Sequence, residues 1–111
     1  NNGIPGVFKN AIDWLSRPSS DMARVFGGKP VAVCGASPGA LGTVLSQNAW
    51  LPVLRTLGTD LWSGGRLLVS RASTLMDADG RLADEATRAR LAQFVAGFVT
   101  YVQSRRGGPQ S

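Results

Sequence analysis

The sequence contains no histidine, a single cysteine and no long apolar run. Without histidine, no Ser–His catalytic pair can form within the chain. One cysteine cannot form an intramolecular disulfide, and the place of Cys34 inside an apolar run predicts a small buried strand residue rather than a reactive thiol. No apolar stretch approaches the roughly 18 residues of a membrane span, and no secretory signal pattern opens the chain. We therefore expect a soluble, cytoplasmic protein.

Positive charge is in excess but is not concentrated. The 12 Lys and Arg against 7 Asp and Glu give +5, of which Arg105 and Arg106 in a polar segment contribute two, leaving +3 elsewhere. The other basic residues form no run and are not interleaved with aromatic residues, so nucleic-acid binding is not predicted. A mildly basic face would still help to attract a phosphorylated, anionic substrate.

Helical and extended patterns alternate along a chain whose 111 residues and 43% hydrophobic content fit one domain. A helix is predicted from Pro5 to Arg17, with apolar residues on one stripe, and a surface connection over Ser19 to Gly28. A continuous apolar run from Pro30 to Gly35 predicts a strand that is covered on both faces.

The second half of the chain repeats this order. A helix is predicted over Ala40 to Leu57, with a kink or restarted turn at Pro52 and with Gly58 just past its end. A strand follows over Arg66 to Ala72, then a turn at 77–80 and a helix over Asp84 to Gln103. The leucines and valine expected to face inward on the first of these helices are Leu41, Val44, Leu45, Leu51, Leu54 and Leu57.

The resulting order of helix, strand, helix, strand, helix indicates an α/β fold with a parallel sheet. Two parallel strands cannot by themselves make a covered sheet, so we expect further strands upstream or from another chain. Residues 1–104 are interpreted as the C-terminal part of one domain, and residues 105–111 as a flexible polar tail.

Directly behind the first strand lies a glycine-rich loop, Gly35-Ala36-Ser37-Pro38-Gly39, where α/β sheets bind ligands. The loop has the G-x-S-x-G pattern of a hydrolase nucleophile elbow, but Pro38 lacks the N–H that the oxyanion hole needs, and histidine is missing. No Lys-Ser/Thr pair follows, as a Walker A loop requires, and the spacing is wrong for G-x-G-x-x-G. Two readings stay open: a turn that binds nothing, or a small-residue loop that lets a flat ligand approach its N–H groups, with Ser37 as a polar handle.

A second polar loop, Asn1 to Gly6, opens the first helix, and the two loops together predict one cofactor crevice. The turn at Asp77 to Gly80 lacks the glycine and glutamate of a calcium loop, because Leu82 and Arg88 stand at those positions, so no metal site is predicted. Trp14, Trp50 and Trp62 are interpreted as core or interface residues rather than as cofactor-stacking residues.

The stretch Asn1-Asn2-Gly3-Ile4-Pro5-Gly6-Val7-Phe8-Lys9-Asn10-Ala11-Ile12-Asp13-Trp14, followed by Lys29 to Gly39 and Leu41-Gly42-Thr43, resembles the NADPH-dependent FMN reductase family. The resemblance extends from Asn1 to about Val102. It implies a flavodoxin-like three-layer parallel sheet of order 2-1-3-4-5, of which this chain supplies the C-terminal strands four and five with their helices.

The resemblance also implies a site. In the family, a Pro-Glu-Tyr-Asn loop after strand three touches the flavin, and only its last residue is present, as Asn1. The cofactor-binding residues that the family pattern implies are Asn1, Asn2, Gly3, Gly35, Ala36, Ser37, Pro38 and Gly39. The family's phosphate-binding Gly-Ser-x-Arg loop has no counterpart here, so the chain alone is expected to hold FMN poorly or not at all.

The activity that the resemblance implies needs no catalytic side chain. It is hydride transfer from NADPH or NADH to FMN, and onward to quinone, azo, free-flavin or metal-oxyanion acceptors, by a homodimer or homotetramer. Two alternatives are a flavodoxin-type electron carrier, which is usually acidic rather than basic, and a helical interaction module that uses its apolar faces to bind a partner.

Overall fold

The computed structural model describes residues 2–106. Helix α1, Gly6–Leu15, begins directly after Pro5, whose carbonyl accepts the N–H of Lys9 at 2.9 Å. The connection expected over Ser19 to Gly28 is only partly irregular, because it contains a 3-10 turn, Ser19–Asp21, and the short helix α2, Met22–Phe26.

The first predicted strand is split in two, the second is shorter than predicted and covers only Leu67 to Val69, and a further short strand, Asp60–Leu61, forms where none was predicted. Strand β1, Pro30–Val31, pairs in parallel with β3, Asp60–Leu61, and β2, Cys34–Ala36, pairs in parallel with β4, Leu67–Val69. Two residues, Ala32 and Val33, separate β1 from β2, whereas five residues, Trp62 to Arg66, separate β3 from β4. The unequal spacers cannot stay in register, so the ladder is interrupted where Gly64 and Gly65 bend the chain.

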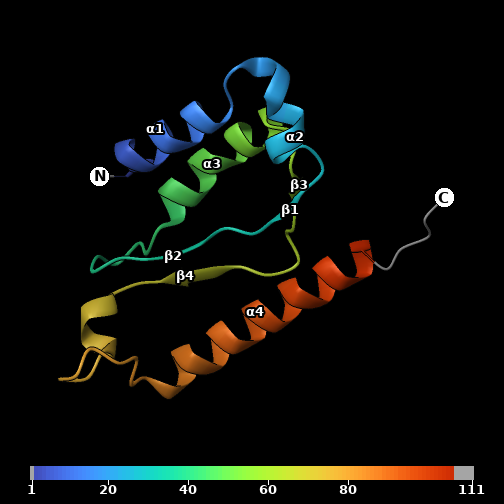
Figure 1. Ribbon diagram of the computed structural model, residues 1–111. Helices are drawn as coiled ribbons and strands as arrows, with labels where there is room; N and C mark the ends of the chain where they lie inside the picture. Colours follow the sequence, from blue (N-terminus) through green and yellow to red (C-terminus); the bar gives the residue numbers. More distant parts are fainter. Residues whose placement is uncertain (1, 107–111) are drawn as a thin grey trace.

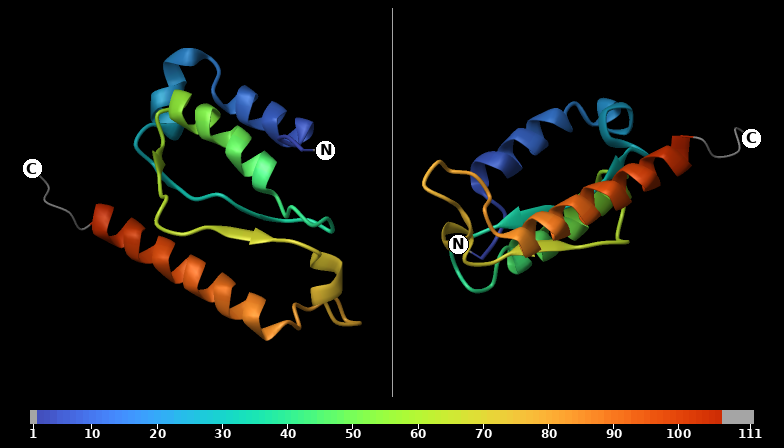
Figure 2. Two further views of the ribbon diagram at one scale, coloured as in Figure 1. Left: turned by 180° about the vertical axis from the view of Figure 1, so that it is seen from behind. Right: turned by 90° about the horizontal axis from the view of Figure 1, so that it is seen from below.

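Helices cover both faces of this strand pair and make three layers. Helices α1 and α3, Val44–Thr56, lie on one side, and α4, Glu85–Arg106, lies on the other (Figures 1 and 2). The parallel α/β arrangement predicted from the sequence is therefore confirmed. None of the helices within residues 2–106 is long and apolar enough to cross a bilayer.

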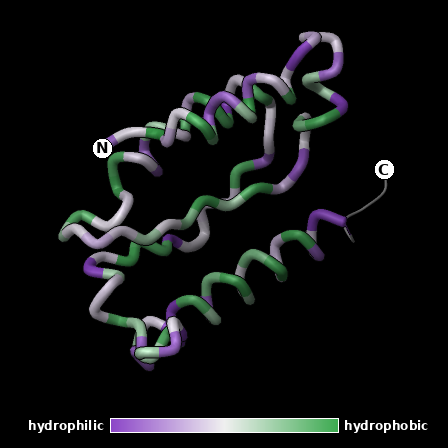
Figure 3. Tube along the Cα trace, turned by 60° about the vertical axis from the view of Figure 1, so that its left-hand side comes forward, coloured by the Kyte–Doolittle hydropathy of each residue, from purple (hydrophilic) through white to green (hydrophobic). Residues whose placement is uncertain are grey.

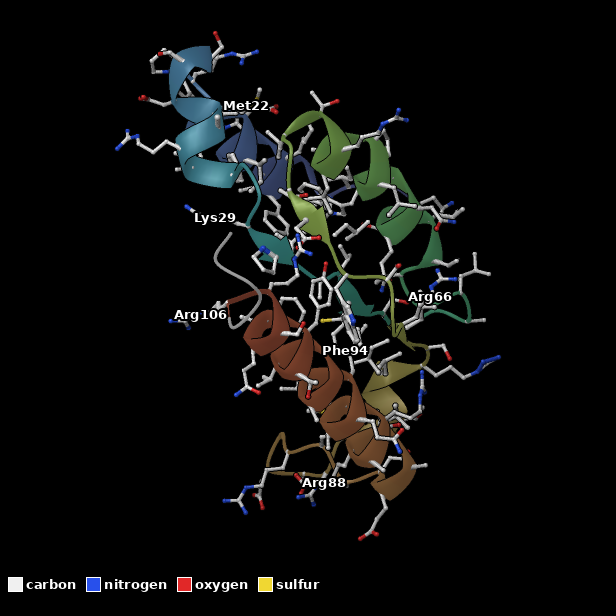
Figure 4. All side chains as sticks on the ribbon, turned by 90° about the vertical axis from the view of Figure 1, so that its right-hand side faces the viewer. Met22, Lys29, Arg66, Arg88, Phe94 and Arg106 are labelled. Atoms are coloured by element: carbon white, nitrogen blue, oxygen red, sulfur yellow. The ribbon has the colours of Figure 1, made fainter. Side chains whose placement is uncertain are left out.

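The core lies between β4 and α4. Leu67, Val69 and Phe94 are buried there, and Trp62 packs its indole against Phe94 with ring centroids 5.3 Å apart. Hydrophobic colour follows both strands and recurs along α4 (Figure 3). Figure 4 shows Phe94 directed from α4 toward the strands and Arg88 directed away from them.

The inward face expected for α3 is partly wrong. Leu57 is buried as expected, but Leu41, Leu45 and Leu51 are exposed, and the buried positions within the helix are Gln47 and Trp50. The Gln47 side chain donates to the carbonyl of Leu67 at 2.9 Å, so this polar residue lies on the face of the helix that is turned toward the strands. Helix α3 continues through Pro52 without a restart, and Gly58 follows with a φ of 75°, as expected for a residue past the helix end.

Cys34 is exposed, so its predicted burial is wrong. Strand β2 pairs with β4 alone among the strands of residues 2–106.

The end of the chain differs slightly from expectation. The turn at 77–80 is present, with the N–H of Gly80 donating to Asp77 at 3.0 Å. Asp84 precedes α4, and its carboxylate accepts the Thr87 hydroxyl at 2.7 Å and the Thr87 N–H at 3.0 Å, which lowers the pKa of Asp84. Helix α4 includes Arg105 and Arg106, which the sequence assigned to a tail, and the rest of that predicted tail, 107–111, lies outside the described residues.

Candidate functional site

The glycine-rich loop begins inside β2, to which Gly35 and Ala36 belong, and its residues 37–39 leave the carboxyl end of this strand, held against the segment that leaves β4. The N–H of Ser37 donates to Val69 at 2.9 Å, the N–H of Ala72 donates to Ser37 at 2.9 Å, and the N–H of Arg71 donates to Gly39 at 2.9 Å. These bonds extend the strand pairing past the sheet. The loop therefore stands at the carboxyl edge of two parallel strands, where such sheets bind ligands.

Gly35 is required by packing. A Cβ built on Gly35 would lie 2.3 Å from the Thr43 hydroxyl oxygen, which also accepts a hydrogen bond from Gln47 at 2.8 Å. The glycine therefore lets the start of α3 approach the end of β2. Close helix packing explains its lack of a side chain without any ligand.

Ser37 is already engaged inside the loop. Its hydroxyl donates to the carbonyl of Gly42 at 2.5 Å. The hydroxyl proton is therefore used to hold the turn into α3, and the oxygen keeps only acceptor capacity toward a ligand.

Gly39 is the open position of the loop. A Cβ built there would meet only the Ser37 hydroxyl oxygen, at 4.0 Å, and Ala36 and Pro38 are exposed beside it. Within residues 2–106 the backbone N–H groups of Gly39 and Ala40 donate no hydrogen bond. A flat molecule could lie on this surface and accept hydrogen bonds from both groups.

The N-terminal loop lies at the same end of the molecule (Figures 1 and 2). Asn1 is outside the described residues, whereas Asn2 is exposed with a φ of 64° and Gly3 has no atom within 4 Å of a built Cβ. Pro5 lines the same cavity as Gly35 and Ala36. The two loops that the sequence assigned to one crevice are thus close to one another.

Sequence reasoning missed an apolar cavity of about 400 Å³ between α1, α3 and the strands. Phe8 and Trp50, which line it together with Cys34, contact each other with ring centroids 4.9 Å apart. The spacing of four residues between Phe8 and Ile12 on α1 indicated an apolar helix face, but no pattern showed that the face would remain open.

The three tryptophans take different places. Trp50 is buried, Trp62 packs against Phe94 and Phe98, and Trp14 is 73% exposed on α1. The core interpretation holds for Trp50 and Trp62, and none of the three belongs to the loops at the carboxyl edge.

The loops at the carboxyl edge of the strands offer open space and backbone N–H donors, and their residues 2–6 and 35–39 offer no acidic, basic or metal-binding side chains. Among the described residues, no cluster of three or more Cys, His, Asp or Glu could hold a metal ion. Small residues and two N–H groups without a hydrogen-bond partner within residues 2–106 stand at the carboxyl edge of a parallel α/β sheet, the place where flavodoxin-like proteins bind their ligands.

Comparison with known proteins agrees with this class. Residues 1–74 match the family described as NADPH-dependent FMN reductase, and the chain belongs to that family. It is 37% identical over 106 residues to a 2-hydroxy-1,4-benzoquinone reductase of a Burkholderia species, covering 96% of this chain and 57% of the relative. It is 36% identical over 107 residues to an NAD(P)H-dependent FMN reductase of Pseudomonas aeruginosa, covering 96% and 56%.

The fold is also that of a solved relative. The structure superimposes on FerB, a flavoenzyme NAD(P)H:(acceptor) oxidoreductase from Paracoccus denitrificans, with a TM-score of 0.81 and 36% identity, covering 94% of this chain and 56% of that one. The expectation that the chain supplies the C-terminal strands and helices of a flavodoxin-like domain is confirmed. The chain spans about half the length of the relatives that it matches.

The residues at the edge fit one side of a flavin ring. Gly39 leaves room for a flat ring, and the N–H groups of Gly39 and Ala40 are donors suited to its carbonyl edge. The roles of Asn2, Gly3 and Gly35 to Gly39 in flavin binding remain predictions.

Proposed function

We propose that the intact protein is an FMN-dependent NAD(P)H oxidoreductase that reduces quinones and related acceptors, among them azo compounds, free flavins and metal oxyanions. The observation that carries this proposal is the open small-residue edge at Gly39, found in a chain of the NADPH-dependent FMN reductase family. Reductases of benzoquinone and of FMN among its relatives support the acceptor class.

In this proposal the flavin, when bound, supplies the hydride-accepting chemistry. The chain supplies position and polarity: the N–H groups of Gly39 and Ala40 stabilise negative charge at the ring edge, and the small residues of the loop leave one face accessible. Asn2 and Gly3 complete the same edge from the N-terminal loop. No side chain of residues 2–106 is assigned a proton-transfer role.

The cellular setting is also proposed. We expect a cytoplasmic homodimer or homotetramer that acts on soluble nicotinamide dinucleotides and small acceptors, without nucleic acid or membrane partners. Light scattering of the intact protein tests the assembly, with a mass of two or four copies as the expected result.

The test is the absorbance spectrum of the purified intact protein under anaerobic conditions. We expect bound flavin, bleaching of its band by NADPH or NADH, and recovery of the band on addition of benzoquinone. A flavin that neither dinucleotide reduces would indicate an electron carrier instead. A protein that retains no added FMN would contradict the proposal and favour an interaction module.

A further inference from the structure

Arg71 has an unusual backbone conformation at the candidate site. Its φ is 49° and its ψ is 44°, which places it in the left-handed region, where glycine and asparagine are favoured and arginine is uncommon. It is the second residue after β4 ends at Val69, at the carboxyl edge of the strands. Strained residues of this kind occur preferentially at functional sites, where the surrounding structure holds them.

The surrounding structure does hold Arg71. Its N–H donates to the carbonyl of Gly39 at 2.9 Å, and its own carbonyl accepts the N–H of Thr74 at 3.0 Å and the hydroxyl of Thr74 at 2.7 Å. Both backbone groups are therefore fixed, and one is fixed directly to the open residue of the glycine-rich loop.

The side chain of Arg71, by contrast, is exposed and uncommitted. Within residues 2–106 its guanidinium makes no hydrogen bond and no ion pair, whereas Arg90 donates to the Leu68 carbonyl and Arg105 pairs with Asp60. A guanidinium presents a planar fork of donors that matches the oxygens of a phosphate. A fixed backbone with a free guanidinium, next to the site, is suited to capture a phosphate that arrives from solution.

We propose that Arg71 binds a phosphate group of the nicotinamide dinucleotide and so determines affinity for this substrate. The inference rests on the proposed function and adds to it a residue for substrate recognition. An exposed rim position fits a substrate that must exchange at every turnover better than it fits the phosphate of a retained cofactor. The phosphate can be the 2′-phosphate of NADPH or the pyrophosphate that NADPH and NADH share.

The test uses the intact flavoprotein with Arg71→Asn, because asparagine tolerates the left-handed conformation. NADP⁺ and NAD⁺ are titrated into the oxidised protein by calorimetry, and KM and kcat are measured with NADPH and with NADH. We expect affinity to fall roughly ten- to hundredfold, from the loss of a charge-assisted hydrogen bond, with kcat at saturation largely retained. Loss with NADP⁺ alone identifies the 2′-phosphate, and equal loss with both identifies the pyrophosphate.

Two further variants control the result. Arg88→Gln removes the same charge from an exposed position on α4 that points away from the strands, and it should leave both affinities unchanged. Arg71→Lys keeps the charge and should restore part of the affinity. If Arg71→Asn does not fold, Arg71→Gly serves in its place, because glycine adopts a positive φ at no steric cost.

Unchanged affinity for both dinucleotides, or an equal loss in Arg88→Gln, would overturn the assignment. Loss of bound FMN from the Arg71 variant with dinucleotide affinity intact would overturn it as well, because the residue would then hold the cofactor. A wild-type protein that carries no flavin is a separate result, which contradicts the proposed function itself.

Discussion

The two faces of the strand pair differ sharply in how well they are covered. On the α4 side Leu67 is 4% exposed and Phe94 is 8% exposed. On the α1 and α3 side, α1 has no buried residue, Phe8 is 53% exposed, and a cavity of about 400 Å³ remains. Both faces are apolar in sequence. The difference shows that apolar periodicity identifies a face that requires cover but does not show how completely the helices of the chain cover it.

The largest expected effect is the loss of unfolding free energy when one aromatic side chain on each face is truncated to alanine. Phe94→Ala in the 111-residue chain should lower the free energy of unfolding by about 3–5 kcal/mol, because it opens a cavity between β4 and α4. Phe8→Ala should cost clearly less, since its ring is half exposed. Urea denaturation of both variants measures the difference, and equal losses would show that the two faces are covered equally well.

A second pair of variants separates packing from ligand access within the glycine-rich loop. Gly35→Ala should lower the free energy of unfolding by about 1–3 kcal/mol, because the new methyl group overlaps Thr43. Gly39→Ala has open space and should be close to neutral for stability, but in the intact protein it should weaken FMN binding by crowding the ring. Urea denaturation and fluorescence titration with FMN check the two outcomes. Weakened FMN binding in neither variant would remove Gly39 from the site.

The coupling energy between the two aromatic rings beside the cavity should be smaller. The rings of Phe8 and Trp50 meet at 4.9 Å, so a double-mutant cycle with Phe8→Ala and Trp50→Ala should give a coupling energy of about 0.5–1.5 kcal/mol. A coupling energy near zero would mean that the two rings do not interact and that α1 does not pack firmly against α3.

The smallest expected effect concerns the cap of α4, on the covered face. Donation from the Thr87 hydroxyl, and then from its N–H, lowers the pKa of Asp84 in the folded state. Its contribution is therefore present above the unfolded pKa of about 3.9 and is lost as the pH falls through the lower folded pKa. Asp84→Asn keeps an acceptor and removes the titration, so its urea midpoint should depend less on pH between 5 and 2 than that of the wild type. Identical pH dependence would exclude this role.

The order of the elements could be predicted because its signals are local. Helical spacing and the stops at Pro18, Gly58 and Gly80 lie within a few residues of the elements they bound, and the centre of β4 was identified from its apolar run. The rotation of α3 could not be predicted, because it depends on a hydrogen bond from Gln47 to Leu67, twenty residues away. The exposure of Cys34 could not be predicted either, because it depends on how completely α1 and α3 cover their face of the strands.

The candidate site divides in the same way. A loop of small residues after a strand is readable from sequence, and the structure places it at the carboxyl edge as expected. The role of each residue in the loop could not be predicted from the sequence. Gly35 makes room for Thr43, the Ser37 hydroxyl donates to the carbonyl of Gly42, and Gly39 faces open space. The left-handed backbone of Arg71 had no sequence signal, because arginine is not a residue that favours it.

The most direct test is a crystal structure of the intact protein with FMN. The account predicts that the flavin ring lies against Gly39 and Ala40 at the carboxyl edge of the strands, with the N-terminal loop at Asn2 and Gly3 beside it. A ring seated instead in the apolar cavity that Phe8 and Trp50 line, or away from both loops, would contradict this placement.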